Sequence, residues 1–151
     1  MNSIGCLRIW NEYAPEKLKP KLKESDSVYR VATYKKFLNK ENINKFTAKA
    51  FKLRGATETR KREKSLSVSW TLLCNKDTAA PKLRNVYGHA IGNVGKIRSL
   101  TNQRNYEIDV IFKPTDDNIA HSEITGLPHE DDSIADSEYF ATKLVDIFNR
   151  V

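Results

Sequence analysis

The chain of 151 residues has the length of one ordinary domain, with 39% hydrophobic and 30% charged residues and a formal net charge of +7. Its two cysteines are too few for a disulfide framework and lie in no zinc-binding spacing. Its first residues have neither the apolar run of a signal peptide nor the length to cross a bilayer, so we expect a cytoplasmic protein that does not enter a membrane.

The charge is unevenly distributed along the chain. Residues 1–65 carry a net +10 and residues 66–113 a net +4, whereas residues 114–151 carry a net −7. A basic surface attracts polyanions such as DNA or RNA. An acidic end suits a metal ion, a basic protein partner or a second copy of the chain, so a protein complex or a homo-oligomer is a further expectation.

The first 27 residues are expected to form a basic N-terminal arm or linker. Residues 14–27 hold four lysines and two prolines, which favour a solvated segment over a packed element. We expect a single domain over residues 28–151, beginning with a short strand at residues 28–33.

A helix is predicted between Glu41 and Arg54. Apolar residues recur there at the spacing of one helical face, and Gly55 follows as a natural C-terminal stop. A strand with Phe46, Ala48 and Ala50 on one face is the competing interpretation, and so short a run leaves both open.

The middle of the chain predicts strands. Apolar and polar residues alternate over residues 65–74 and again over 106–112, which is the pattern of half-buried strands. Residues 86–91 and 94–100 predict two more strands joined by a tight hairpin at Gly92-Asn93, since both residues tolerate positive φ. The simplest topology for these strands is a meander.

The chain ends in a predicted amphipathic helix at residues 134–151, in which apolar side chains form one stripe. Asp132 or Ser133 can cap its first turn, and Asp136 forms an approximate capping box with Ser133 and suits the positive end of the helix dipole. The expected fold is therefore α+β, a mainly antiparallel sheet packed against this C-terminal amphipathic helix.

A basic loop precedes the strand at residues 65–74. Side chains of arginine and lysine neutralise phosphates without reading base sequence, so these residues are candidates for nucleic-acid binding. Several later or earlier cations could widen the patch if they share its face, and a solvated charged loop is the plain alternative. The loop candidates are Arg60, Lys61, Arg62 and Lys64, and the cations that could widen the patch are Lys49, Lys52, Arg54, Arg98 and Arg104.

The stretch from residue 116 to 132 concentrates two of the three histidines with six carboxylates. Imidazole and carboxylate groups together can bind a divalent metal or share acid and base catalysis, as in metal-assisted phosphodiester hydrolysis. Exposed turn residues and a helix cap explain the same pattern. The candidate catalytic or metal-binding residues are Asp117, His121, His129 and Glu130.

Three fragments, Ala50-Phe51-Lys52, Leu66-Ser67-Val68-Ser69-Trp70 and residues 121–128 (HSEITGLP), resemble a loose group of small uncharacterised bacterial proteins. The resemblance implies an accessory protein of a mobile-element or defence system and supplies no established activity.

The chain is also similar in layout to ADP-ribosyltransferases. These enzymes have an arginine on an early strand, serines on a middle strand and a later glutamate. The matching residues here are Arg30, Ser67 and Ser69, with Glu107 or Glu123 as the glutamate.

Three functions remain open from the sequence. The first is a nucleic-acid-associated binding or accessory protein that contacts phosphates through the basic loop. The second is an enzyme, either a small metal-dependent nuclease or an ADP-ribosyltransferase-like toxin. The third is a structural subunit of a protein complex.

Overall fold

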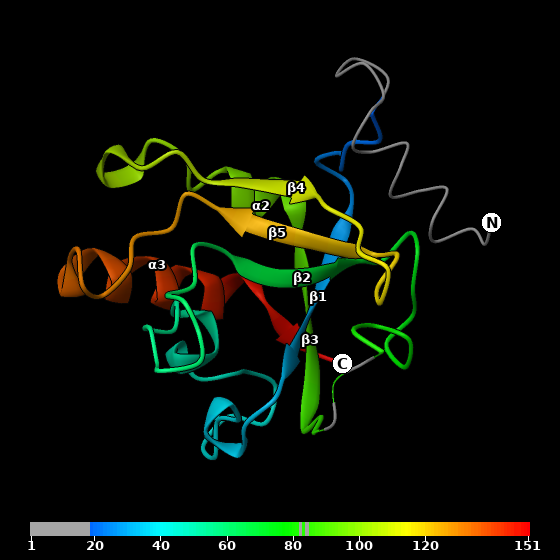
Figure 1. The fold of residues 1–151 in the computed structure, drawn as a ribbon, viewed down its shortest axis with the longest axis horizontal. Coiled ribbons are helices and arrows are strands. Elements are labelled where there is room, and N and C mark those ends of the chain that lie inside the picture. Colours follow the sequence, from blue (N-terminus) through cyan, green and yellow to red (C-terminus); the bar gives the residue numbers. More distant parts are fainter. Residues whose placement is uncertain (1–18, 82, 84) are drawn as a thin grey trace.

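The computed structural model describes residues 19–81, 83 and 85–151, and the fold is built on one antiparallel sheet (Figure 1). The sheet has six strands in the order β4-β5-β2-β1-β3-β6. Together with a C-terminal helix, it confirms the predicted α+β class. The strands are β1 (Ser27–Ala32), β2 (Leu66–Trp70), β3 (Gly88–Asn93), β4 (Asp109–Phe112), β5 (His121–Thr125) and β6 (Asn149–Arg150).

The long helix α3 (Ile134–Ile147) confirms the predicted C-terminal helix, but it ends four residues earlier than expected because Asn149 and Arg150 pair with β3 as β6. The Ser133 hydroxyl accepts a hydrogen bond from the backbone N–H of Asp136 at 3.1 Å, as the predicted cap requires. Phe140 and Leu144 of this helix are buried in the core. The remaining helices are short: α2 (Val94–Arg98), η2 (Lys35–Phe37), η3 (Ala48–Phe51) and η4 (Gln103–Asn105).

The sheet divides between its two central strands. β1 pairs with β3 over six residues, and β2 pairs with β5 over four, but β1 and β2 pair only at Val28 with Trp70 and at Tyr29 with Ser69. Beyond these two pairs the strands separate. Figure 1 shows β2, β5 and β4 running across the view while β1 and β3 run in a clearly different direction. The candidate site lies in the gap between the two halves of the sheet.

The helix predicted between Glu41 and Arg54 is wrong. Only the four residues of η3 are helical, and Ile43, expected on the buried face, is 76% exposed. The Asn39 side chain accepts hydrogen bonds from the backbone N–H groups of Glu41 and Asn42 at 2.9 and 3.0 Å. Such local bonds compete with helical hydrogen bonding, so the asparagine-rich segment forms turns instead.

The hairpin predicted at Gly92-Asn93 is also wrong. β3 runs through both residues, and α2 replaces the strand expected at residues 94–100. The Asn93 side chain accepts from the backbone N–H of Lys96 at 2.9 Å and so caps α2. Gly92 is needed for packing, because a Cβ there would lie 2.7 Å from the ring of Phe148.

The meander topology is wrong as well, because β5 lies beside β2 and β3 beside β1. The strands predicted at 28–33, 65–74, 86–91 and 106–112 exist as β1, β2, β3 and β4 with shifted bounds. Long connections between them carry the short helices and loops that line the candidate site.

Most of the predicted N-terminal arm, residues 1–18, lies outside the described residues. In the rest of the arm, Leu22 is buried, and its carbonyl accepts a hydrogen bond from Arg98 Nη1 at 2.7 Å. Within the described residues, no helix combines the length and apolar character needed to cross a membrane.

Candidate functional site

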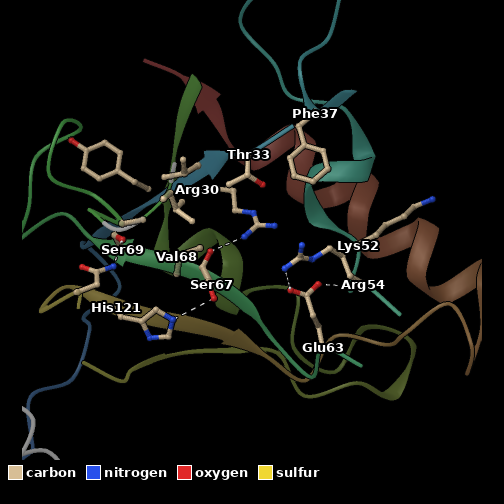
Figure 2. A pocket seen from close by; sticks show the side chains of 15 residues that line it. Arg30, Thr33, Phe37, Lys52, Arg54, Glu63, Ser67, Val68, Ser69 and His121 are labelled. Atoms are coloured by element: carbon tan, nitrogen blue, oxygen red, sulfur yellow. Dashed lines mark hydrogen bonds and ion pairs between the residues drawn. The ribbon is translucent and has the colours of Figure 1, made fainter. Parts of the chain in front are cut away.

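A pocket of about 150 Å³ opens where β1 and β2 separate (Figure 2), and it is called the strand-gap pocket here. Its walls come from β1, β2, the start of β5, and the loops around residues 52–63 and 80–83. Polar and cationic side chains predominate. The lining residues are Tyr29, Arg30, Val31, Thr33, Phe37, Lys52, Arg54, Glu63, Ser67, Val68, Ser69, Ala80, Leu83, Asn118 and His121.

Arg30 bridges the gap between the two strands. Its Nη1 donates to the carbonyl of Ser67 at 2.9 Å, and its Nε donates to the carbonyl of Ala50 at 2.9 Å. These bonds fix the guanidinium plane at the wall of the pocket. Nη2 makes no hydrogen bond with a described residue, so this N–H group is available to a ligand.

The pocket carries positive charge. Burial lowers the pKa of Arg30 to about 10, an effect that Glu63 partly offsets, so the side chain stays protonated at neutral pH. Glu63 also binds Arg54: its carboxylate accepts from the backbone N–H at 2.6 Å and from Nη2 at 3.2 Å. Lys52 and Arg54 also line the pocket, but Lys52 pairs with Glu138 and Glu130 and Arg54 pairs with Glu63. Arg30 is therefore the cation through which the pocket favours an anionic ligand.

Ser67 and His121 form a hydrogen-bonded pair across β2 and β5 (Figure 2). His121 Nδ1 lies 2.8 Å from the carbonyl oxygen of Lys113, which can only accept, so Nδ1 carries the proton. In the neutral tautomer Nε2, 3.3 Å from Ser67 Oγ, is then the acceptor for the serine hydroxyl. The pair presents an oriented hydroxyl group to the pocket.

Glu123 stands beside this pair. It is directly opposite Ser67 in the β2–β5 ladder, so both side chains lie on the same face of the sheet. Its carboxylate is 3.7 Å from Nζ of Lys113, and the side chain is 18% exposed. Glu107, the other candidate glutamate, precedes β4 and lines a separate hollow beside Asn102 and Thr125. Glu123 therefore lies beside Ser67, but it is not among the residues that line the strand-gap pocket, and no contact among the described residues joins it to Arg30.

An open groove of about 530 Å³ adjoins the strand-gap pocket along η3 and is called the η3 groove here. Phe37, Lys52 and Arg54 line both, so the two hollows share a wall. The groove residues are Tyr34, Lys36, Phe37, Lys49, Lys52, Leu53, Arg54, Gly55, Arg60, His129, Glu130 and Asp131.

The predicted basic loop is divided between two surfaces. Arg60 lines the η3 groove, whereas Lys61, Arg62 and Lys64 line a hollow on the other side of Leu53. Arg62 is engaged within the chain, because its Nη2 lies 2.7 Å from Asp132. The two hollows share Leu53 and His129, so the four residues lie along adjoining surfaces.

Of the other cations expected to widen the patch, three share the groove and two do not. Lys49, Lys52 and Arg54 line the η3 groove. Arg98 binds Asp109 at 2.8 Å, and Arg104 binds Asp136 at 3.0 Å. The cations in η3 and directly after it therefore line the groove, and those beyond β3 have structural ion pairs elsewhere.

The predicted metal or catalytic residues are dispersed. His121 lines the strand-gap pocket, His129 and Glu130 line the η3 groove, and Asp117 is exposed between β4 and β5. In the part of the chain that the structure describes, no three His, Cys, Asp or Glu residues gather closely enough to hold a metal ion. The arrangement gives no support to a metal centre built from these four residues.

Acidic residues near the C-terminus pair with the basic body of the same chain. Lys52 binds Glu138 and lies 3.6 Å from Glu130, and Arg62 contacts both Asp131 and Asp132. Part of the acidic charge that suggested a protein partner is thus neutralised by basic residues of the same chain.

Sequence reasoning missed Glu63 and Asn118 as pocket residues. Asn118 Nδ2 donates to Ser69 Oγ at 3.1 Å, and both side chains are buried. Neither residue belongs to a sequence motif. Both reach the pocket only because β5, β2 and β1 are neighbours in the sheet. The order of arginine and serine along the chain did select Arg30, Ser67 and Ser69. The charge pattern separately selected Lys52, Arg54 and His121, which also line the pocket.

Comparison of the chain with protein-family models, curated proteins and solved structures found no match in any of the three.

Proposed function

We propose that the protein is an ADP-ribosyltransferase that binds NAD⁺ in the strand-gap pocket. The observation that carries this proposal is that Arg30 donates to the Ser67 carbonyl across the strand gap, while Glu123 lies opposite Ser67 on β5, on the other side of β2. These residues are separated by 37 and 56 positions in the sequence. Their placement on three adjacent strands supports the enzyme layout that their order suggested.

The charge of the pocket suits the diphosphate of NAD⁺. Arg30 keeps one N–H free, and Lys52 and Arg54 stand at the wall between the pocket and the η3 groove. Arginine and lysine donate charge-assisted hydrogen bonds to phosphate oxygens. With its volume of about 150 Å³, the size of a cavity that binds one benzene-sized ring, the pocket has room for the nicotinamide ring rather than the whole dinucleotide.

The transfer reaction needs a carboxylate close to the ribose, and Glu123 is the residue proposed to supply it. Transfer breaks the bond between ribose C1′ and the nicotinamide nitrogen, which leaves with the electron pair, while an acceptor oxygen or nitrogen bonds to C1′ and loses a proton. Positive charge develops on the ribose as the bond breaks, and a fixed carboxylate stabilises that charge. Lys113 holds the Glu123 carboxylate in place. The Ser67–His121 pair can bond to ribose hydroxyl groups beside it.

The test is release of nicotinamide from NAD⁺, measured by chromatography with the protein alone and with a cell extract as the source of acceptors. We expect release that falls about 100-fold or more in Glu123→Gln, the usual cost of removing one electrostatic contact to a transition state. Glu107→Gln is the matched control, because Glu107 lies away from the pocket. Absence of release by the wild-type chain, or equal rates in the two variants, contradicts the proposal.

A further inference from the structure

We infer that the η3 groove binds single-stranded nucleic acid through its phosphates and bases. The groove residues used here do not line the strand-gap pocket, so binding of the nucleic-acid strand does not depend on NAD⁺ chemistry. The further step, that the bound strand is the acceptor of ADP-ribose, rests on the proposed function.

The groove holds cations that no carboxylate neutralises. Lys36 and Lys49 are exposed and form no ion pair with a described residue, and the guanidinium of Arg60 donates only to the carbonyl of Gly55, at 3.0 Å. Lys52 and Arg54, by contrast, are paired with carboxylates. Unpaired cations along a groove are positioned to neutralise successive phosphates of a strand.

Two N–H groups at the groove lack acceptors. Arg60 Nε and His129 Nε2 are buried and have no hydrogen-bond partner among the described residues. His129 Nδ1 accepts from the backbone N–H of Asp131 at 3.0 Å, which leaves the proton on Nε2. Buried donors without partners are unfavourable, so both groups would gain from an acceptor oxygen. Because neither atom is in contact with solvent, a ligand oxygen reaches them only if the groove lining moves.

Tyr34 supplies a surface for stacking. Its side chain is on the groove, the residue is 42% exposed, and the ring packs edge-on against Phe37 at 5.3 Å between centroids. Arg54 Nη1 lies 3.3 Å from its hydroxyl, which helps to fix the ring. Lys36 Nζ lies over the ring, 5.2 Å from its centroid, so an unpaired base stacks either in place of this lysine or on the opposite face.

These features favour a single strand over a duplex or an acidic peptide. A duplex is read by an element that enters its groove, and this surface is hollowed instead. An acidic peptide offers charge but no base to stack on Tyr34. Because the groove shares Phe37, Lys52 and Arg54 with the strand-gap pocket, a strand bound there lies beside the pocket mouth.

The test is fluorescence anisotropy without NAD⁺, at about 50 and 200 mM salt, where loss of phosphate contacts becomes visible. The probes are labelled 12-nucleotide single strands of DNA and RNA, the matching duplex and a polyglutamate peptide. The groove variant is Lys36→Glu with Lys49→Glu. The matched control is Lys96→Glu with Lys143→Glu, which reverses two charges outside the groove.

We expect the single strands to bind best and the groove variant to weaken their binding about 10-fold or more at low salt, with a smaller salt dependence. Tyr34→Ala should weaken binding about 5-fold or more, and Tyr34→Phe should retain it. Equal losses in the groove and control variants overturn the inference. So does tighter binding of the duplex or of polyglutamate than of either single strand.

Nicotinamide release by the same variants without nucleic acid separates the two proposals. The groove variant should retain release, because neither lysine lines the strand-gap pocket. Strand binding without any nicotinamide release leaves the groove standing and removes the proposed enzyme activity. Nicotinamide release without strand binding leaves the proposed enzyme activity standing and removes the η3 groove as a nucleic-acid site.

Discussion

Arg30 Nη1 donates to the carbonyl oxygen of Ser67 at 2.9 Å and so joins β1 to β2 beyond the point where their backbone pairing ends. A side chain thus replaces backbone hydrogen bonds between two central strands. The replacement satisfies a carbonyl that the separation of the strands would leave unpaired, and it leaves the space that forms the strand-gap pocket. Arg30 therefore links two strands of the sheet and also lines the pocket in which a ligand would bind.

Arg30→Lys should destabilise the protein by about 1–3 kcal/mol, because an ammonium group cannot reach both carbonyls in the planar geometry of the guanidinium. Arg104→Lys is the matched control. Arg104 makes an exposed ion pair with Asp136, and its replacement should cost less than about 1 kcal/mol. Urea denaturation measures both free energies of unfolding, and equal values would contradict the structural role of Arg30.

Gly126→Ala should be strongly destabilising. Gly126 has φ of +85°, and a Cβ there would lie 1.7 Å from the carbonyl oxygen of Glu107. Strain and a forced backbone shift together should cost about 3 kcal/mol or more. Gly55→Ala, where a Cβ meets nothing within 4 Å, should change stability by less than about 1 kcal/mol. Thermal denaturation tests the difference, and similar melting temperatures for the two variants would contradict the positive φ described for Gly126.

Lys45→Met should also lower stability, by about 1–3 kcal/mol. Lys45 Nζ donates to the carbonyls of Val145, Asp146 and Phe148 at 3.1, 3.0 and 3.3 Å and so caps the C-terminal end of α3. Lys40→Met removes an exposed lysine that makes no hydrogen bond or ion pair with a described residue. Amide exchange in the last turn of α3 should quicken in the first variant only.

Cys74 should react slowly with thiol reagents. Burial raises the pKa of its thiol to about 11, and Sγ donates to the carbonyl of Trp70 at 3.3 Å. At pH 8 the thiolate fraction is then about 200-fold lower than for an ordinary thiol of pKa about 8.5. In a Cys6→Ser background, the rate of labelling by a disulfide reagent should be low at pH 8 and rise steadily toward pH 11. Fast labelling at pH 8 would contradict this environment.

The sequence predicted the elements whose residues follow a long, regular pattern. The alternation through Leu66, Val68 and Trp70 gave β2, and the stripe with the Ser133 cap gave α3. It failed where local side-chain bonding decided the backbone. Asn39 bonds to nearby N–H groups in place of the expected helix, and Asn93 caps a helix where a hairpin was expected.

The candidate site was predictable only in part, because it depends on strand order. Arg30, Ser67 and Glu123 were visible as a possible set, but nothing local indicated that β5 lies beside β2 or that β1 and β2 separate. The prominent basic run was a weaker guide. Arg62 is bound by acidic residues 70 positions away, a contact that charge counting cannot foresee.

The central claim is that NAD⁺ binds in the strand-gap pocket, and an NMR titration tests it most directly. At 17.3 kDa, the ¹⁵N-labelled chain gives well-resolved amide spectra, and NAD⁺ can be added to millimolar concentration. The account predicts saturable shifts at Ser67, Ser69 and His121 in the wild-type chain, with much weaker binding in Arg30→Lys. Shifts confined to other surfaces, or none at about 5 mM NAD⁺, near the weak end of ordinary ligand affinities, would contradict it.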